Sequence, residues 1–484
     1  METRQQIGFL LGAGASYECA MPLTSELTAE LRAKLTPEKL RDFNQAWHKQ
    51  GGGHPESVIE ALADVWVRPG LHYESILGFL ETQFRRNVLR QDYHALYSWL
   101  IEAVYWILYT RHLNNVDYIQ RNIKWYSGLA RLACSNPPVW IFSLNHDLII
   151  ECLAAAHGIP VNSGFGKDTL SLPRRDRAGK MIGELRAQII TDDQLEQYLA
   201  FSEPGSPGIN LLKLHGALDV FAFGNHGKDL VKLLPLENTV AGVLDTLRVA
   251  NKELVYREPR APGGLIRATN EIAYADESGE MHFLRRTLLA GAFKFDKRES
   301  QVLPAKLLDH FRSRINAVTK LGAVGYSFGD IHVNQVLREW LEFKGDRLLE
   351  IVQPDAICIP DCLLHLAPQI KLVPLTASEY FDCASGITRT NREILEKRLA
   401  AWARAQGNSP TSRKEFAQFI REFTTNGMRE FARDIAKLTR DRDIDLATIG
   451  TSAEDFASRW ASDHSFNVES MIGKFLATRQ PTST

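Results

Sequence analysis

Residues Ile7–Pro22, IGFLLGAGASYECAMP, join a buried strand to a loop of small residues, and the rest of the chain is organised around them. The apolar run IGFLL ends in GAGAS at positions 12–16, and a helical pattern follows over Ser25–Leu35. Glycines let the backbone approach a ligand closely, and free N–H groups near a helix start favour an anion such as a pyrophosphate. The alternative is a tight turn that binds nothing, since Tyr17 stands where a dinucleotide-binding fingerprint has its third glycine.

Length, charge and cysteine usage exclude several classes of protein. The 484 residues are enough for roughly two to four domains, and the net charge of −1 argues against a generally basic nucleic-acid binder. Six cysteines without a CxxC pair favour free thiols in a reducing cytoplasm over a zinc site. The most apolar segment, Ala95–Tyr109, is too short to cross a bilayer and contains Glu102, so we expect a buried helix, a soluble cytoplasmic protein and no membrane partner.

Strand-like apolar runs alternate with helical patterns through residues 1–378. After the first strand, such runs cover Val139–Leu144, Ile209–Leu214, Ala323–Tyr326 and Leu349–Val352. A block of helical periodicity, residues 36–135, separates the first strand from the others. We therefore predict an α/β fold, a doubly wound and mostly parallel Rossmann-like sheet with a helical insertion.

Three regions are less regular. The charged stretch 167–207 predicts surface loops with short helices, and the stretch 220–300 predicts only short strands near Met281–Leu289. From residue 379 to 484 the periodicity is helical throughout. We interpret this last region as an oligomerisation or partner-docking module, with simple packing on the core as the alternative.

Polar residues follow the predicted strands directly: SLNHD at 143–147, KLHG at 213–216, GYSFGD at 325–330 and QPD at 353–355. Ligands of open parallel sheets bind at this edge. His215 has an ordinary pKa near neutrality and can act as a general base, and Asn145 can orient a water or a hydroxyl group without adding charge. Structural alternatives stay open: a histidine before glycine is often structural, Asn145-His146-Asp147 can be turn chemistry, and His146 is a rival base.

In this order, the four segments resemble the sirtuin-like superfamily, specifically its prokaryotic branch found in anti-phage defence proteins. The resemblance covers about residues 5–360 and implies NAD as the substrate. It places the first loop and Pro22 against the NAD phosphates and the nicotinamide ribose, and Asn145 and Asp147 in the nicotinamide pocket, with His215 as the catalytic histidine. The implied set is catalytic Asn145 and His215, with NAD-binding Gly12, Ala13, Gly14, Ala15, Ser16, Pro22, Asp147, Gly325, Ser327, Gln353 and Asp355.

Two departures from the deacetylase sirtuins narrow the implied reaction. The chain lacks their paired zinc-binding cysteines, and Leu144 stands where those enzymes have glutamine. Both favour water as the acceptor, so we expect an NAD glycohydrolase that releases nicotinamide and ADP-ribose without a metal. The alternatives are a non-enzymatic sensor of NAD or ADP-ribose derivatives and an NAD-dependent protein deacylase.

The resemblance also implies how such an activity is controlled. A constantly active NAD hydrolase would be toxic, so we expect a defence effector that is gated by assembly. Relatives act as homo-oligomers, with hexameric HerA-type DNA-translocating ATPases, or with short Argonautes. The helical C-terminal region favours self-assembly or the ATPase, and no direct sequence-specific binding of nucleic acid is expected.

Overall fold

The computed structural model describes residues 6–87, 89–135, 138–197, 199–224, 228–254, 269–291, 294–295, 303, 305–390, 393–394 and 397. The chain divides into a compact unit, Met1–Ser385, and a second unit, Gly386–Thr484. From residue 398 onward, the predicted helical module lies outside the described residues.

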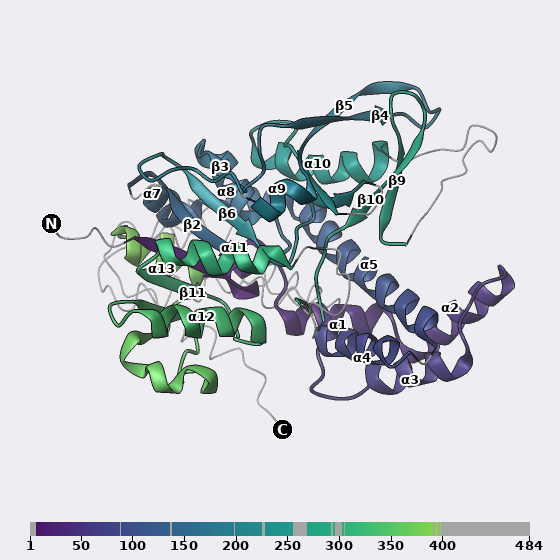
Figure 1. Ribbon diagram of the computed structural model, residues 1–484, viewed down its shortest axis with the longest axis horizontal. Helices are drawn as coiled ribbons and strands as arrows, with labels where there is room; N and C mark the ends of the chain where they lie inside the picture. The colour runs from purple at the N-terminus through teal and green to yellow at the C-terminus, as the bar shows by residue number, and fades with distance from the viewer. Residues whose placement is uncertain are drawn as a thin grey trace, which may run out of the picture. The chain divides into compact units, whose positions relative to one another are not determined.

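A seven-stranded parallel sheet forms the centre of the first unit (Figure 1). Its strands run in the order β13-β12-β11-β1-β2-β6-β3. Apart from the two-residue edge strand β3, this is the order 3-2-1-4-5-6 of the Rossmann fold. The predicted α/β fold with a doubly wound parallel sheet is therefore confirmed. The strands are β1 (Ile7–Leu11), β2 (Val139–Ser143), β3 (Val161–Asn162), β6 (Ile209–Lys213), β11 (Lys320–Val324), β12 (Leu348–Val352) and β13 (Ile370–Val373).

Helices cover both faces of this sheet because alternate residues of each strand enter two different cores. On β1, Phe9 and Leu11 pack into one core, whereas Leu10 packs into the other. Phe9 contacts Phe381 with ring centroids 5.3 Å apart. The first core takes in α1 (Thr24–Lys34), α8 (Ile149–His157) and α13 (Ala377–Ser385); the second takes in α11 (Lys306–Arg314), α12 (Ile331–Phe343) and the 3-10 segment η4 (Asp361–Gln369).

The segment between β1 and β2 is helical, as its periodicity predicts. Its longest helix, α5 (Arg90–Asn114), contains Ala95–Tyr109 and buries Leu96, Leu100 and Val104 in the first core. None of the described helices combines the length and hydropathy needed to cross a bilayer. The other helices of the segment are α2 (Pro37–Lys49), α3 (Glu56–Trp66), α4 (Tyr73–Arg85), α6 (Val116–Asn122), the 3-10 segment η2 (Ile123–Tyr126) and α7 (Ser127–Ser135).

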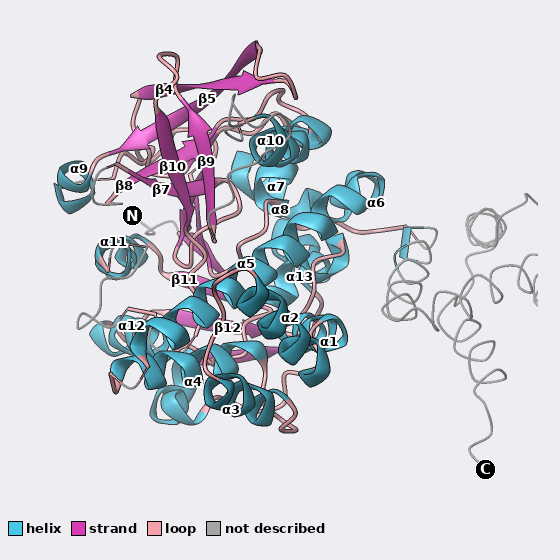
Figure 2. Cartoon of the chain, turned by 90° about the vertical axis from the view of Figure 1, so that its right-hand side faces the viewer, coloured by secondary structure: helices cyan, strands magenta, loops and turns pink. Residues whose placement is uncertain are grey.

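A second, six-stranded antiparallel sheet was not predicted (Figure 2). The expectation of surface loops at 167–207 is wrong for most of this stretch, because β4 (Thr169–Arg175) and β5 (Met181–Ile190) form a long hairpin. On β5, Leu185 and Ala187 pack into a core shared with α10 (Val240–Glu253), while Glu184 and Arg186 face solvent. The charged residues at the solvent-facing positions obscure the alternation of apolar and polar residues that is typical of a strand. The strand expected near Met281–Leu289 is present as β10. The sheet order is β4 (Thr169–Arg175), β5 (Met181–Ile190), β8 (Asp229–Leu233), β7 (Val220–Phe223), β10 (Met281–Arg286) and β9 (Glu271–Ala275), with α9 (Asp192–Gln197) after β5 and α10 (Val240–Glu253) packed on the sheet.

Candidate functional site

A cavity of about 1230 Å³ lies at the carboxyl ends of the parallel strands. Residues in the loops just after β1, β2, β11 and β12 line it, namely Gly12, Asn145, Gly325 and Gln353. At β1 the winding of the sheet reverses, because β2 continues on one side and β11 on the other. Open α/β sheets bind ligands at such a reversal of strand order. The cavity therefore occupies the place where this fold forms a binding site.

Glycines let the loops after β1 and β11 cross in close contact. The Gly12 N–H donates to the Val324 carbonyl at 3.0 Å, and the Gly14 N–H donates to the Gly325 carbonyl at 3.0 Å. A Cβ atom on Gly12 would lie 2.5 Å from the Gly325 oxygen, and Gly325 itself has a φ of +62°. The loop does not lead directly into α1: the short 3-10 segment η1 (Ala13–Cys19) intervenes, and α1 begins only at Thr24.

The structure brings most of the sequence-predicted residues to this one cavity. Ala15 and Ser16 are the exceptions, since both are buried and neither lines the cavity. The Ala15 carbonyl accepts a hydrogen bond from the Tyr126 hydroxyl at 2.6 Å. The predicted residues that line the cavity are Gly12, Ala13, Gly14, Pro22, Asn145, Asp147, His215, Gly325, Ser327, Gln353 and Asp355.

Asn145 ties the end of β2 to the glycine loop. Its Nδ2 group donates to the Gly12 carbonyl at 2.8 Å and to the Ser16 hydroxyl at 3.1 Å. Because a backbone carbonyl can only accept, these contacts assign the amide orientation and leave Oδ1 as the acceptor of this side chain. Asn145 therefore both positions the loop and presents an acceptor at the cavity.

His215 lies in the loop after β6 and lines the cavity, and its side chain is buried. Its Nε2 atom lies 3.0 Å from Oδ2 of Asp330. Burial lowers the pKa of His215, and the nearby charge of Lys294 lowers it further, while Asp330 opposes the shift. The net direction is downward, which favours the neutral imidazole.

Asp330 is a site residue that the sequence reasoning missed. Its Oδ1 atom accepts hydrogen bonds from the N–H groups of His332 and Val333 at 3.0 and 3.2 Å, so it caps the N-terminus of α12. Burial raises the pKa of Asp330, but its contacts with His215 and Lys294 outweigh burial and hold that pKa well below the usual range. The aspartate that ends GYSFGD directly before a helical pattern was the available signal for this cap.

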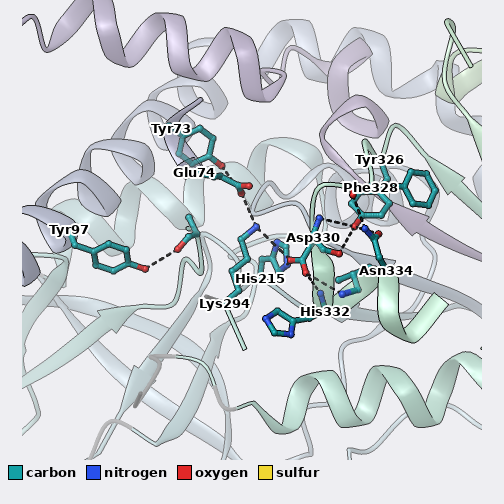
Figure 3. A network of polar contacts seen from close by, with 12 residues as sticks. Tyr73, Glu74, Tyr97, His215, Lys294, Tyr326, Phe328, Asp330, His332 and Asn334 are labelled. Carbon is teal, nitrogen blue, oxygen red and sulfur yellow. Dashed lines mark hydrogen bonds and ion pairs between the residues drawn. The ribbon is translucent and has the colours of Figure 1, made fainter. Parts of the chain in front are cut away.

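Lys294 and Glu74 were also missed, and they complete the polar network (Figure 3). The Lys294 ammonium lies 2.9 Å from Oε1 of Glu74, on α4, and 3.7 Å from Oδ2 of Asp330. Lys294 is buried and lines the same cavity as His215 and Glu74. No local pattern indicated these two residues, because one belongs to the helical segment and the other to the irregular stretch 220–300.

His146, the rival base, lies beside His215 with ring centroids 6.5 Å apart. Burial, together with the neighbouring His215 and Lys294, lowers the pKa of His146 to about 3. A general base works best when its pKa is near the working pH, so His146 is a poor candidate for that role. His215 is the better candidate of the two.

Asp147 has a structural role at the start of α8. Its Oδ1 atom accepts a hydrogen bond from the Ile149 N–H at 3.1 Å, and its carbonyl contacts the ammonium group of Lys213. The turn chemistry considered for Asn145-His146-Asp147 is thus present at Asp147, although this residue also lines the cavity.

Two Lys or Arg side chains line the cavity, Arg32 and Lys294. Lys294 is neutralised by Glu74, whereas Arg32 forms no ion pair with any described carboxylate and donates to the carbonyls of Arg68 and Leu71 at 2.9 Å.

The described side chains that group like metal ligands are Asp276, Glu280 and His282, at the β9–β10 hairpin and outside this cavity.

Comparisons with known proteins add no relative. A scan against models of known protein families finds no match to this chain, and a search of curated proteins finds none either. The function is therefore inferred from the fold and from the geometry of the cavity.

Proposed function

We propose that this protein is an NAD glycohydrolase that cleaves NAD to nicotinamide and ADP-ribose. One observation carries the proposal: Asn145 and His215, which follow different strands, line a single cavity together with the glycine loops after β1 and β11. The cavity volume of about 1230 Å³ exceeds the roughly 300–1,000 Å³ typical of small-molecule pockets, which suits a dinucleotide.

The lining offers suitable partners for each part of NAD. The backbone of Gly12–Gly14 and the loop at Gly325 can approach the pyrophosphate closely, and Arg32 supplies a positive charge on the same cavity. Gln353 and Asp355 follow β12 and can bind ribose hydroxyls. This arrangement supports a bound dinucleotide that extends from β12 toward His215.

The chemistry requires few catalytic groups because the leaving group is already cationic. A water oxygen bonds to C1′ of the nicotinamide ribose while the C1′–N1 bond breaks, and its electron pair neutralises the pyridinium nitrogen of nicotinamide. His215 accepts the proton of the attacking water and later releases it to solvent. Asn145 Oδ1 can hold this water or a ribose hydroxyl in line with C1′.

We further infer that the activity is the toxic effector of a bacterial anti-phage defence system and is gated by assembly. The ordered sirtuin-like segments of the sequence support this role. The helical periodicity of the sequence from residue 379 onward supports self-assembly or the docking of a HerA-type ATPase. Measuring NAD levels in infected and uninfected cells that express the chain tests the inference, and unchanged NAD on infection would contradict it.

A sensor of NAD or ADP-ribose derivatives is the second candidate. It is favoured by the burial of His215 and by the salt bridges that surround it, since both features also suit a pocket that binds without turnover. Tight binding of NAD with no release of nicotinamide, unaffected by His215→Ala, would select this candidate.

The deciding experiment is chromatographic measurement of nicotinamide release by the full chain, alone and with any co-purifying partner. We expect His215→Ala to abolish release while NAD binding persists. Asn145→Ala should abolish release and also weaken binding, because it removes both hydrogen bonds to the glycine loop. His157→Ala, at an exposed histidine outside the cavity, is the matched control and should behave as wild type. Wild-type rates in both site variants would refute the assignment.

A further inference from the structure

We propose that Asp330 is a positioning residue that determines which nitrogen of His215 accepts a proton: it holds the hydrogen on Nε2, so that Nδ1 is the base. This inference rests on the proposed hydrolysis, since it names the atom that receives the proton of the attacking water. Asp330 itself touches no substrate in this scheme and acts through His215.

The position of the Asp330 carboxylate is set by the fold. One oxygen, Oδ1, is occupied by the two N–H groups at the start of α12, which directs the other oxygen, Oδ2, to His215 Nε2 at 3.0 Å. Neither Nε2 nor Oδ2 has a hydrogen bond of good angular geometry, although their separation is that of an ion pair. Catalytic hydrogen bonds are often poorly aligned without substrate and tighten when it binds.

The protonation state of Asp330 decides the tautomer of His215. An ionised carboxylate can only accept, so the hydrogen between the two residues belongs to Nε2. The neutral imidazole then carries its lone pair on Nδ1, which has no hydrogen-bond partner in the part of the chain that the structure describes. Nδ1 is therefore the nitrogen that is free to take a proton from a ligand in the cavity.

Burial and, after it, the charge of Lys294 lower the pKa of His215 and so favour the form that can act as a base. Without a cation nearby, a buried aspartate would favour the imidazolium form of His215, which cannot accept a proton. Lys294 lies 3.7 Å from the same Asp330 oxygen and is held by Glu74 at 2.9 Å. The titratable groups that face His215 are thus Asp330 from the N-cap of α12, Lys294 from the 294–295 segment, Glu74 from α4 and His146 from the loop after β2.

In the reaction, Nδ1 takes one proton from water as the water oxygen bonds to C1′. The imidazolium that forms is stabilised by the Asp330 carboxylate, which stays ionised throughout. The proton then passes to solvent, so the enzyme returns to its starting state with NAD and water converted to nicotinamide, ADP-ribose and one proton.

Asp330→Asn tests the inference, because asparagine still caps a helix but can donate a hydrogen bond to Nε2. That bond forces the hydrogen of His215 onto Nδ1 and removes the base. We expect kcat to fall by at least about 100-fold while KM changes little, since general-base catalysis contributes about 10²–10⁴-fold. Asp346→Asn, in an exposed turn, is the matched control and should keep the wild-type kcat. An Asp330→Asn variant with wild-type kcat would overturn the inference.

Two further measurements separate this role from a merely structural one. Lys294→Met should raise the pKa of His215 and move the acid limb of the kcat/KM profile to higher pH; an unmoved limb would count against the network.

Nitrogen-15 NMR of histidine-labelled protein, with His215 assigned by His215→Gln, reports the tautomer without any turnover. An Nδ1–H tautomer in the wild type overturns the inference whatever the activity. An Nε2–H tautomer that switches in Asp330→Asn upholds it, even if NAD is not cleaved and the proposed function fails.

Discussion

Three buried histidines, His112, His146 and His215, lie in or beside the cavity, and the fold lowers the pKa of each. His112 uses both ring nitrogens: Nδ1 donates to the Leu108 carbonyl at 2.7 Å, and Nε2 accepts from the Leu148 N–H at 3.2 Å. Burial is the main cause of the lowered pKa of His112, as it is for His146 and His215. The folded protein therefore excludes protons that the unfolded chain would bind.

This difference predicts a loss of stability in mild acid. Below pH about 6.5 the unfolded histidines bind protons, whereas His146 stays neutral in the folded state down to its pKa of about 3. Within that window His146 lowers the free energy of unfolding by about 1.4 kcal/mol per unit of falling pH, and the lowered pKa values of His112 and His215 act in the same direction. Urea denaturation between pH about 7.5 and 5 measures the slope.

His146→Gln isolates one of these contributions. As the pH is lowered, the free energy of unfolding of this variant should fall less steeply than that of the wild type. The two slopes should differ by about 1.4 kcal/mol per pH unit. Asp330 does not obscure the comparison, because its pKa is held well below the usual aspartate range and it stays ionised over this interval. An identical pH slope in the two proteins would show that His146 does not titrate on unfolding.

At the scale of elements, the crossing of the loops after β1 and β11 determines the shape of the cavity. Gly325 has a positive φ, and a Cβ atom there would lie 2.4 Å from backbone atoms of Gly14 and Ala15. Backbone cannot move aside as a flexible side chain can. The two loops therefore depend on the absence of a side chain at this position.

Gly325→Ala should lower the free energy of unfolding by about 2–5 kcal/mol. The left-handed conformation costs an alanine about 1–2 kcal/mol, and overpacking adds about 1–3 kcal/mol. Equilibrium denaturation measures the loss. Gly345→Ala is the matched control, because Gly345 has no positive φ and a Cβ atom there would meet nothing within 4 Å; it should change stability by less than about 0.5 kcal/mol. Equal stability of the two variants would contradict this account of the crossing.

At the scale of the whole first unit, a buried ionic cluster joins the two sheets. Lys232, on β8 of the antiparallel sheet, lies 2.5 Å from Asp219 and 3.5 Å from Glu151 of α8. Lys213, at the end of β6 in the parallel sheet, lies 3.4 Å from the same Glu151. All four side chains are nearly inaccessible to solvent. The cluster links the sheet that carries His215 to a sheet formed by a different part of the chain.

Lys232→Met should lower the free energy of unfolding by about 3–5 kcal/mol, because it leaves the buried Asp219 carboxylate without a counter-charge. Adding Asp219→Asn to this variant should restore part of the loss. Thermal or urea denaturation of the single and double variants checks both results. Lys228→Met, which breaks an exposed ion pair with Asp192, should cost at most about 1 kcal/mol. A single variant as stable as this control would mean that the cluster does not hold the sheets together.

Much of the parallel sheet could be predicted from local sequence pattern. Buried parallel strands need nearly continuous apolar runs, and β2, β6 and β12 are such runs, each followed at once by polar residues. Parallel strands place those carboxyl ends at one edge, which is why Asn145, His215 and Gln353 were expected together and line one cavity. The antiparallel sheet escaped prediction because its outward charged residues mask the alternation in β4 and β5.

The sequence by itself determined most of the parallel sheet, the edge at which polar residues follow its strands and the identity of those residues, because burial periodicity is a local property. Only the tertiary structure decided that Glu74, His215, Lys294 and Asp330 meet. These four residues come from a helix, a strand end, an irregular segment and a helix cap, and no periodicity relates them. Their ionisation and tautomer depend on distances of 3–4 Å between segments remote in sequence, and such distances exist only once the chain is folded.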